Sequence, residues 1–484
     1  MLAAMGIAAS FSTSCKAAGT ERPRLVVGIV VDQMRWDYLM RYADKWGEGG
    51  FRRLMESGYS YDNTYLCYVP SVTAVGHASI YSGTTPAVHG IAGNDFYMDN
   101  KKVYCTDDHA VKTVGSNTAA GEMSPRNMLS TTIGDQLKLA YPKARVVGVS
   151  LKDRAAILPA GHSADAAFWW DNTAGLFITS SYYMNSLPKW LNDFNASHHR
   201  TTDVRYVPDG ISLTADLAIA AIDGYALGRG EATDMLAVSF SSTDYVGHKF
   251  GTMAPETEEV YLRTDKELAR LFAYLDEKVG RDNYLVFLTA DHAAAHNSDE
   301  MAQRRIPSGE WSEEALQNVN GCLKTRFGVD CDLVKSLIEY RFYLDDDAIE
   351  RNRLDREVVK QELIRHLESD PRVMQAIDYQ KVRQTTVIPA IADRIVMGYN
   401  AKRSGDVIAV MQSGVYEVSE SSFKRGTTHG VWNPYDSHIP LLFYGWHICK
   451  GRSSESVQVI DIATTVCSML DIQQPNGSVG RVLR

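Results

Sequence analysis

The chain has 484 residues, of which 45% are hydrophobic and 23% charged, and its formal net charge at pH 7 is −9. At this length the chain can bury a large core, either as one α/β domain with insertions or as two domains, and its composition is ordinary for a globular protein. The negative net charge argues against a dedicated nucleic-acid-binding protein, because such proteins usually present a basic face.

The N-terminal segment, residues 1–16, is short, apolar and rich in small residues. Such a segment is typical of a secretory signal, although no Lys or Arg precedes it. We therefore expect residues 1–22 to be a signal or lipoprotein leader and the protein to be exported, in a bacterium to the periplasm. Cys15 is a candidate for a lipid anchor, and a disordered leader is the alternative. No other stretch of 18 or more apolar residues occurs, so we expect no membrane span.

Six cysteines remain when Cys15 is set aside, and an even number in an exported chain is compatible with disulfide bonds. We expect Cys322 to pair with Cys331, because they close a short loop. A bond between Cys67 and Cys105 is a second possibility. No pair has CxxC spacing, so we expect no cysteine zinc site.

Strand-like and helix-like segments alternate from residue 24 to 160, which is typical of a parallel sheet with helical crossovers. The pattern predicts strands at 25–31 and 145–150, and helices near 36–57, at 72–81 and at 129–139. Further along, it predicts helices at 213–227, 258–278 and 460–470, and strands at 235–240, 284–289 and 440–444.

Two segments interrupt this alternation. Residues 161–210 are aromatic and polar with weak periodicity, and we interpret them as an insertion over the site. Their Phe168-Trp169-Trp170 string could shape leaving-group preference or belong to the core. Residues 293–428 hold a charged helical stretch at 347–368 and a strand-rich part, which predicts an inserted cap subdomain. The catalytic core would then comprise residues 23–292 and 429–484.

Six acidic and histidine residues follow strand-like apolar runs or lie in a Gly-rich turn: Asp32, Asp244, His248, Asp291, His292 and His429. Side chains at the carboxyl ends of parallel strands can converge at one edge of a sheet. Six such ligands are enough for two zinc ions with open positions. Two metal ions a few Å apart suit phosphoryl transfer. Taken singly, each residue could equally form a cap or a salt bridge.

A candidate nucleophile lies in the string Pro70-Ser-Val-Thr-Ala-Val-Gly-His77. A hydroxyl in the first turn of a helix faces unpaired N–H groups and the positive end of the helix dipole. Thr73, activated by a metal ion, could attack phosphorus and form a phosphothreonine that water hydrolyses. On position alone, Thr73 or Ser71 could simply cap the helix. We interpret His77 and His89 as structural residues and not as ligands.

Seven motifs occur in a specific order: VVGIVVDQMR, SVTAVGHASIYSGTTPAVHGIAGNDFY, SLKDRAAI, STDYVGH, TADHA, GYNAKRSGD and GTTHG. With this order and spacing, residues 24 to about 472 resemble the alkaline phosphatase superfamily. The closer resemblance is to the phosphate-irrepressible bacterial alkaline phosphatases, in the branch shared with nucleotide pyrophosphatase/phosphodiesterases. The resemblance implies an α/β fold, an alkaline-phosphatase-like three-layer sandwich with a central, mostly parallel sheet and an inserted cap subdomain.

The resemblance also implies roles for the site residues. One zinc ion would be held by Asp32, Asp291, His292 and Thr73, and the other by Asp244, His248 and His429. Asn94 would donate a hydrogen bond to a phosphoryl oxygen, and Lys152 and Arg154 would contact the other oxygens or the nucleophile. On an extended segment Lys152 and Arg154 would face the same side. Manganese or iron could occupy similar sites.

The pair Lys152 and Arg154 favours phosphate monoesters, because a monoester dianion carries more charge than a diester, and in the family this motif accompanies monoesterases. We therefore expect a monomeric hydrolase that releases inorganic phosphate from small organic phosphates. The alternatives are a phosphodiesterase or nucleotide pyrophosphatase of the same superfamily and a catalytically silent binding protein. A sulfatase is disfavoured, because residues 71–75 lack the Cys/Ser-x-Pro-x-Arg string.

Overall fold

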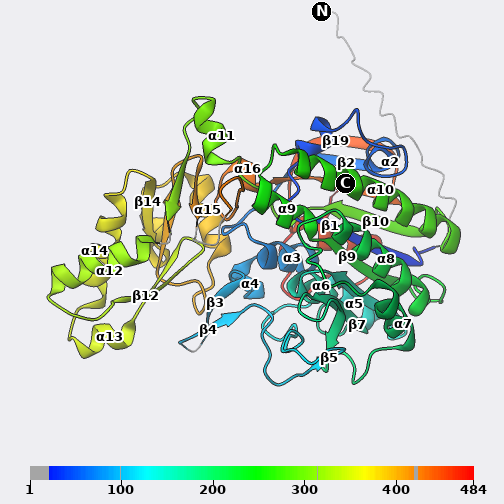
Figure 1. Cartoon of the computed structure of the whole chain (residues 1–484), viewed down its shortest axis with the longest axis horizontal. Coiled ribbons are helices and arrows are strands. Elements are labelled where there is room, and N and C mark those ends of the chain that lie inside the picture. Colours follow the sequence, from blue (N-terminus) through cyan, green and yellow to red (C-terminus); the bar gives the residue numbers. More distant parts are fainter. Residues whose placement is uncertain (1–20, 99, 313, 419–422, 484) are drawn as a thin grey trace, which may run out of the picture.

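The computed structural model describes residues 21–98, 100–312, 314–418 and 423–483. Figure 1 shows a larger lobe built around a central sheet and a second lobe, drawn in yellow and orange, on its left. Almost all of the expected leader and the candidate lipidation site Cys15 lie outside the described residues. In the part of the chain that the structure describes, no helix is both long enough and apolar enough to cross a membrane.

The central sheet has eleven strands in the order β17-β2-β18-β10-β1-β9-β6-β7-β8-β5, with β19 paired to β2. The strands are β1 (Leu25–Val31), β2 (Tyr59–Tyr65), β5 (Thr113–Val114), β6 (Val146–Ser150), β7 (Ala166–Asp171), β8 (Leu176–Ser180), β9 (Asp234–Phe240), β10 (Tyr284–Thr289), β17 (His438–Ile439), β18 (Leu441–Gly445) and β19 (Gly451–Gln458).

The middle of this sheet is parallel. β1 lies between β9 and β10, all three strands are fully buried, and β6 and β7 continue the parallel part beyond β9. The strand direction reverses at β18 next to β10 and, on the other side of the parallel part, at β8 next to β7. Continuous Val-, Ile- and Leu-rich runs explain this arrangement, because parallel strands are covered on both faces. The five strands predicted from the sequence are confirmed to within one residue.

Two sets of helices cover the sheet, so the three-layer fold is confirmed. One set consists of α3 (Thr73–Ser82), α5 (Ile133–Ala140), α6 (Asp153–Ala160) and α17 (Asp461–Met469), which pack against one another. The other consists of α2 (Phe51–Ser57), α7 (Lys189–His198), α8 (Asp209–Gly224), α9 (Ser242–Phe250) and α10 (Pro255–Lys278). The short helices α1 (Tyr38–Arg41), α4 (Pro86–His89), α11 (Ser298–Gln303) and α16 (Pro434–Ser437) lie in connections.

Three predicted helices differ from the structure; the one expected at 213–227 begins at Asp209 and ends at Gly224. The single helix expected near 36–57 is divided into α1 and α2, because the carboxylate of Asp265 accepts hydrogen bonds from the backbone N–H groups of Gly47 and Phe51 and fixes the glycine-rich turn between them. The helix expected at 129–139 begins only at Ile133. Thr132 and Asp135 form a reciprocal capping box there, which defines the first turn.

Residues 161–210 contribute strands to the central sheet, in contrast to the insertion over the site that the sequence predicts. β7 pairs with β6 and β8 with β7, and the side chains of Phe168 and Trp169 are buried. The weak periodicity of the segment follows from this, because a strand buried on both faces has no alternation. The Phe-Trp-Trp string therefore belongs to the core.

The second lobe has its own hydrophobic core around a four-stranded antiparallel sheet in the order β12-β13-β15-β14. Its strands are β12 (Val334–Ile338), β13 (Arg341–Leu344), β14 (Val373–Asp378) and β15 (Val407–Met411). Its helices are α12 (Glu314–Phe327), α13 (Asp346–Arg351), α14 (Arg356–Glu368), α15 (Pro389–Gly398) and the 3-10 helix η1 (Tyr379–Gln384). The strands β11 (Gly309–Ser312) and β16 (Val415–Val418) form a separate parallel pair. The charged stretch predicted at 347–368 is thus α13 and α14.

The expected disulfide bonds are wrong. Cys67, Cys105, Cys322 and Cys331 are all free thiols. Cys322 lies on α12, whereas Cys331 lies beyond the end of that helix, where its Sγ accepts a hydrogen bond from the side-chain amide of Asn352. Nearness in sequence is therefore not enough, because a disulfide also requires the two Cβ atoms to lie close together and face each other.

Candidate active site

The strand register brings the candidate residues to one edge of the sheet. Val30 of β1 is aligned with Thr289 of β10 and with Ser239 of β9, and Ser239 is aligned with Ser150 of β6. Asp32, Asp291 and Lys152 each lie two residues beyond these aligned positions, so three side chains leave the sheet at the same level. This is the edge at which open α/β folds bind ligands.

Asp244 and His248 reach the same edge from helix α9, which follows β9. They are four residues apart, so they lie on one face of the helix, and His248 Nε2 is 3.1 Å from Asp244 Oδ1. His429 comes from the segment after the second lobe, and its ring stacks on that of His292 with centroids 3.5 Å apart. The six residues predicted as metal ligands therefore lie together.

Thr73 is the first residue of helix α3, and every residue of that helix is buried. The N-cap position is occupied by Val72, and no side chain caps the helix. The Ser71 hydroxyl donates instead to the carbonyl of Val431. The capping interpretation of Thr73 and Ser71 is therefore wrong, and the Thr73 hydroxyl is left for other contacts. Gly76 allows helix α3 to pack closely against the backbone of Asp291, because a Cβ at this position would lie 2.3 Å from the carbonyl oxygen of Asp291.

The Thr73 hydroxyl lies between a donor and an acceptor. Its Oγ1 is 3.3 Å from Lys152 Nζ and 3.3 Å from His292 Nε2. His292 Nδ1 contacts the carbonyl oxygen of Ala293 at 3.0 Å and must carry the proton there. Nε2 of the neutral ring is then an acceptor, so the Thr73 O–H group donates to His292 and accepts from Lys152.

All three candidate histidine ligands are oriented in the same way. Nδ1 of His248 donates to the carbonyl of Thr427, and Nδ1 of His429 donates to the carbonyl of Ser71. With the His292–Ala293 contact, each imidazole has Nδ1 fixed by a backbone carbonyl and Nε2 directed to the site. This arrangement is typical of histidines that bind a metal ion, because it sets both tautomer and ring orientation.

Three buried carboxylates share the site with one lysine. Burial and the negative charge of Asp291 raise the pKa of Asp32 well above its ordinary value. Burial opposes ionisation of Asp244 as well, but His248 and Lys152 outweigh it and hold the pKa of that carboxyl well below its ordinary value. Lys152 Nζ donates to Asp32 Oδ2 at 2.7 Å and to Asp244 Oδ2 at 2.6 Å. One lysine leaves this cluster with excess negative charge.

The donor set fits metal ions. Asp32 Oδ1 and Asp291 Oδ2 are buried and have no hydrogen-bond partner among the described residues. Orphaned buried carboxylate oxygens are rare unless a cation is bound. Two groups have ligand atoms within 4.8 Å of one another: Asp32 with Asp291 and His292, and Asp244 with His292 and His429. His292 appears in both groups, but only its Nε2 is available, so it can serve one ion.

Asn94 lies next to Thr73, the candidate nucleophile. Its Oδ1 accepts a hydrogen bond of 3.1 Å from the backbone N–H of Ala74, the residue after Thr73. Because Oδ1 is used in this way, the two hydrogen atoms on Nδ2 remain for another acceptor.

Arg154 and Lys152 are not on an extended segment, in contrast to the sequence-based expectation. Lys152 is the N-cap of α6 and Arg154 lies in its first turn, and the two side chains have different hydrogen-bond partners. Arg154 Nη1 donates to the hydroxyl of Tyr104 at 2.8 Å, and Arg154 Nε has no partner among the described residues. Lys152 therefore contacts Thr73, the candidate nucleophile, directly, whereas the guanidinium of Arg154 is hydrogen-bonded to Tyr104.

His77 and His89 are buried and hydrogen-bonded, as expected of packing residues, and His77 Nδ1 lies 3.3 Å from Asp291 Oδ2. His77 contacts the carbonyl of Thr73 and the hydroxyl of Ser239, and His89 contacts the hydroxyl of Ser79.

Gln33 is a site residue that the sequence analysis missed. Its backbone N–H donates to Asp291 Oδ1 and its Nε2 donates to Asp244 Oδ1. It has a φ of 64°, which is unusual for a residue other than glycine. Its position directly after Asp32 is the single sequence signal that could have pointed to it.

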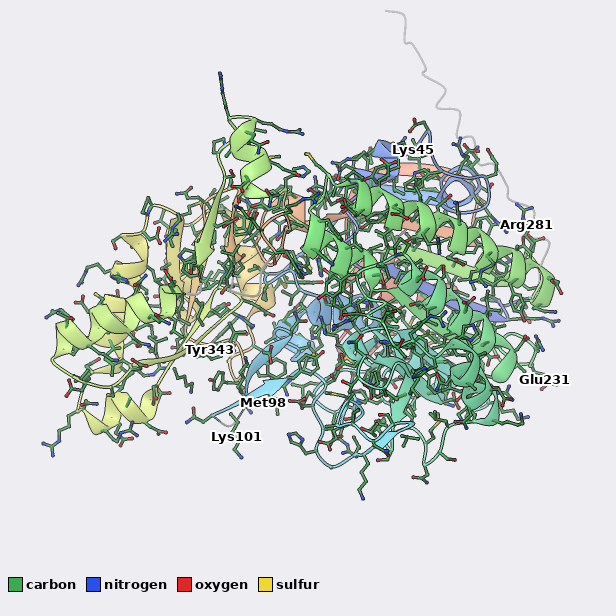
Figure 2. The ribbon with its side chains drawn as sticks, viewed as in Figure 1. Lys45, Met98, Lys101, Glu231, Arg281 and Tyr343 are labelled. Atoms are coloured by element: carbon green, nitrogen blue, oxygen red, sulfur yellow. The ribbon has the colours of Figure 1, made fainter. Side chains whose placement is uncertain are left out.

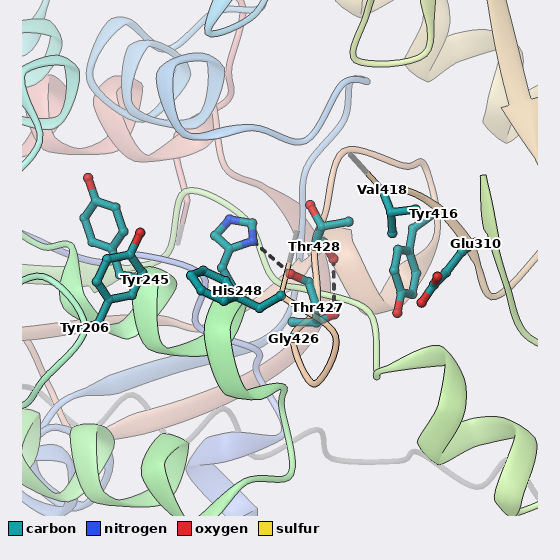
Figure 3. A pocket seen from close by; sticks show the side chains of 10 residues that line it. Tyr206, Tyr245, His248, Glu310, Tyr416, Val418, Gly426, Thr427 and Thr428 are labelled. Atoms are coloured by element: carbon teal, nitrogen blue, oxygen red, sulfur yellow. Dashed lines mark hydrogen bonds between the residues drawn. The ribbon is translucent and has the colours of Figure 1, made fainter. Parts of the chain in front are cut away.

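A cavity of about 320 Å³ opens beside His248. Figure 3 shows Tyr206 and Tyr245 on one side of His248, and Tyr416 and Glu310 on the opposite wall. The rings of Tyr206 and Tyr245 pack edge to face with centroids 5.3 Å apart. The complete lining also includes Val418, Phe423, Gly426, Thr427 and Thr428.

A family model described as type I phosphodiesterase/nucleotide pyrophosphatase matches residues 26–435. The chain is 44% identical to alkaline phosphatase PafA of Elizabethkingia meningoseptica over 96% of this chain and 95% of that protein. It is 40% identical to alkaline phosphatase PhoV of Synechococcus elongatus over 96% of this chain and 92% of that protein. A crystal structure of wild-type alkaline phosphatase PafA superimposes with a TM-score of 0.92 and 43% identity, covering 96% of this chain and 98% of that chain.

Proposed function

Because the chain belongs to the type I phosphodiesterase/nucleotide pyrophosphatase family, we propose that it is an alkaline phosphatase that hydrolyses phosphate monoesters through a phosphothreonine at Thr73. The observation that carries this proposal is the Thr73 hydroxyl at the start of α3. It does not cap the helix, and it is surrounded by three buried carboxylates, three oriented histidines and the Lys152 cation. Such a cluster serves to activate a hydroxyl and to balance the charge of a phosphoryl group.

Two metal ions, proposed to be Zn²⁺, would be divided between the ligands by the geometry of His292. With its single available nitrogen assigned to the ion held by Asp32, Asp291 and Thr73, the other ion would take Asp244, His248 and His429. When bound, zinc ions supply positive charge that promotes loss of the nucleophile's proton and stabilises the leaving oxygen.

The chain's own residues would carry out two displacements. In the first, Thr73 Oγ1 forms a bond to phosphorus while the ester P–O bond breaks, and the alcohol leaves with the proton of the Thr73 hydroxyl. In the second, water attacks the phosphothreonine, the bond from Thr73 Oγ1 to phosphorus breaks, and inorganic phosphate leaves. The Thr73 hydroxyl is restored, so atoms and protons balance over the cycle.

Three side chains would stabilise the phosphoryl oxygens. Lys152 Nζ already contacts Thr73 Oγ1, so it would also lie beside a phosphoryl group on that atom. Asn94 would donate through Nδ2, since its Oδ1 is held by Ala74. Arg154 would extend its guanidinium from Tyr104, with Nε unpartnered among the described residues. The two cations suit a monoester dianion better than a diester, so we propose that diester hydrolysis is a side activity.

The organic part of the substrate would enter the cavity beside His248. Aromatic rings of Tyr206 and Tyr245 and polar groups on the opposite wall make it compatible with small organic phosphates of mixed polarity (Figure 3). We further propose that residues 293–428 act as a cap over this cavity, supported by the position of Glu310 and Tyr416 in its lining. The apolar N-terminal segment supports export to the periplasm.

The test is hydrolysis of a chromogenic aryl phosphate by the purified chain, with zinc added and after treatment with a chelator. We expect turnover with zinc, loss of turnover after chelation and recovery when zinc is restored. A matched aryl sulfate and an aryl phosphodiester should be poorer substrates. An inactive zinc-loaded protein, or a chelated protein of undiminished activity, would reject the proposal.

A further inference from the structure

We propose that the turn Glu339-Tyr340-Arg341 of the second lobe positions Asn94, and so makes the second lobe part of the phosphoryl-binding machinery. This inference rests on the function proposed above. Glu339 and Arg341 would be positioning residues, because they touch the backbone around Asn94 and not the substrate.

Side chains of the turn hold the loop at Asn94 by hydrogen bonds to the backbone of that loop. Glu339 Oε1 accepts from the backbone N–H of Asn94 at 3.0 Å. Arg341 Nη1 donates to the carbonyl of Ala92 at 2.6 Å, and Nη2 donates to the carbonyl of Asp95 at 3.2 Å. The same Nη2 is 2.7 Å from Glu339 Oε2. Three of the four residues from Ala92 to Asp95 are thus attached to one ion pair.

This ion pair is buried, which is costly for two charged groups. The side chain of Arg341 is fully buried, and that of Glu339 is 17% exposed. If the pair served only to stabilise the lobe, apolar residues of similar volume could replace it. The pair instead places charged donors and an acceptor at defined backbone atoms of the other lobe. Its geometry therefore favours a positioning role.

The backbone of the turn has an unusual conformation at two residues other than glycine. Glu339 and Tyr340 connect β12 to β13, and both have positive φ, 49° and 67°. Two-residue hairpin turns require such angles, but Asn and Gly usually occupy them. Residues in this region persist where the surrounding structure holds them, often at functional sites. Here the Tyr340 hydroxyl accepts from the backbone N–H of Glu417 and anchors the turn on its other side.

Gly93 allows the turn to approach so closely. A Cβ at this position would lie 2.3 Å from Arg341 Nη2 and 2.3 Å from Glu339 Oε2. The loop before Asn94 is therefore shaped to accept the ion pair.

Asn94 is fixed at two points as a result. Glu339 holds its backbone N–H, and the N–H of Ala74 holds its Oδ1 next to Thr73. A donor that stabilises a transition state must lie within a fraction of an ångström of its place, since a misplacement of about 1 Å can cost about 100-fold in rate. The turn supplies one of the two constraints that aim Asn94 Nδ2.

The same lobe also contacts the hairpin that follows Asn94, formed by β3 (Asp95–Met98) and β4 (Lys101–Tyr104). The rings of Tyr97 and Tyr343 lie 4.9 Å apart. Figure 2 shows Met98 and Lys101 at the end of this hairpin, below Tyr343 of the second lobe. The hairpin is therefore held by the second lobe at its base and along its length.

The experiment is a double-mutant cycle on the zinc-loaded protein with an aryl phosphate: Glu339→Ala, Asn94→Ala and the two together. We expect Glu339→Ala to lower kcat/KM by about tenfold or more when Asn94 is present and by less than about twofold in the Asn94→Ala background, because coupled residues are not additive. The matched control is Lys360→Met, which breaks the buried Lys360–Asp378 pair elsewhere in the second lobe. It should lower the unfolding temperature while kcat/KM stays within about twofold of wild type.

Full additivity of the two losses, wild-type activity of Glu339→Ala, or an equal loss in Lys360→Met would each overturn the positioning role. An inactive wild type would instead reject the proposed function itself. If Glu339→Ala does not fold, Glu339→Gln enters the same cycle. It keeps an oxygen for the Asn94 N–H and loses the charge that pairs with Arg341, so we expect a smaller loss that again disappears in the Asn94→Ala background.

Discussion

The positive charges of Lys152 and Arg154 should make the enzyme hydrolyse phosphate monoesters in preference to diesters. The perturbation is Lys152→Ala combined with Arg154→Ala. Lys152 Nζ lies 3.3 Å from Thr73 Oγ1 and is buried, so a phosphoryl group on that oxygen would be close to the ammonium and shielded from water. Arg154 is 18% exposed and further out, so its contribution should be smaller.

The magnitude follows from Coulomb's law. A monoester dianion carries one more unit of charge than a diester. Two unit charges about 4 Å apart interact by about 4 kcal/mol at an effective dielectric constant of about 20. Because the charge is spread over three oxygens, we halve this to about 2 kcal/mol, which corresponds to about 30-fold in rate. The monoester kcat/KM should therefore fall at least about 30-fold more than the diester kcat/KM.

The assay compares kcat/KM for an aryl phosphate and an aryl methyl phosphate in the wild type and the double variant. Zinc content must be measured in both, because Lys152 also contacts Asp32 and Asp244. The single variant Arg154→Ala is the matched control for zinc content, since the Arg154 side chain is hydrogen-bonded to Tyr104 and not to a carboxylate of the candidate metal ligands. Equal losses on both substrates at equal zinc content would refute the charge argument.

Two further predictions concern Thr73 as the nucleophile and Tyr104 as the support of Arg154. Thr73→Ala should abolish turnover while zinc remains bound, and Thr73→Ser should keep part of the activity because it keeps a hydroxyl; measurable phosphatase activity in the alanine variant at full purity would exclude Thr73 as the nucleophile. Tyr104→Phe removes the hydroxyl that accepts from Arg154 and donates to Asp153 at 2.7 Å. The loss of a hydrogen bond to a charged group, about 1.5–3 kcal/mol, should lower kcat/KM for monoesters about tenfold or more. An equal effect of Tyr104→Phe in the Arg154→Ala background would show that it does not act through Arg154.

Much of the candidate metal-ligand cluster could be predicted because it depends on local sequence. Apolar runs of five to seven residues predict buried parallel strands, and parallel strands in register end at one edge. Asp32 follows such a run directly and Asp291 is the second residue after another, so the sequence places both near strand ends. Asp244 and His248 are four residues apart on one helix, which is again a local property.

Other features depended on contacts between distant segments. The periodicity of residues 161–210 is weak because β7 and β8 are buried within the sheet, so an interior strand resembled an insertion. The order of the cysteines could not show that Cys322 lies within α12, that Cys331 lies beyond it and that both are free thiols. The extended geometry expected for Lys152 and Arg154 failed because a helix begins between them.

The amino-acid sequence by itself determined the strands, the residues at their ends and the hydroxyl at the start of α3, since propensity and periodicity act over a few neighbouring residues. Only the tertiary structure decided which backbone carbonyl orients each histidine, that Gln33 ties two carboxylates together, and that a turn about 245 residues downstream holds Asn94. Those contacts arise when two lobes pack, and no local pattern encodes the partner that a polar side chain meets across an interface.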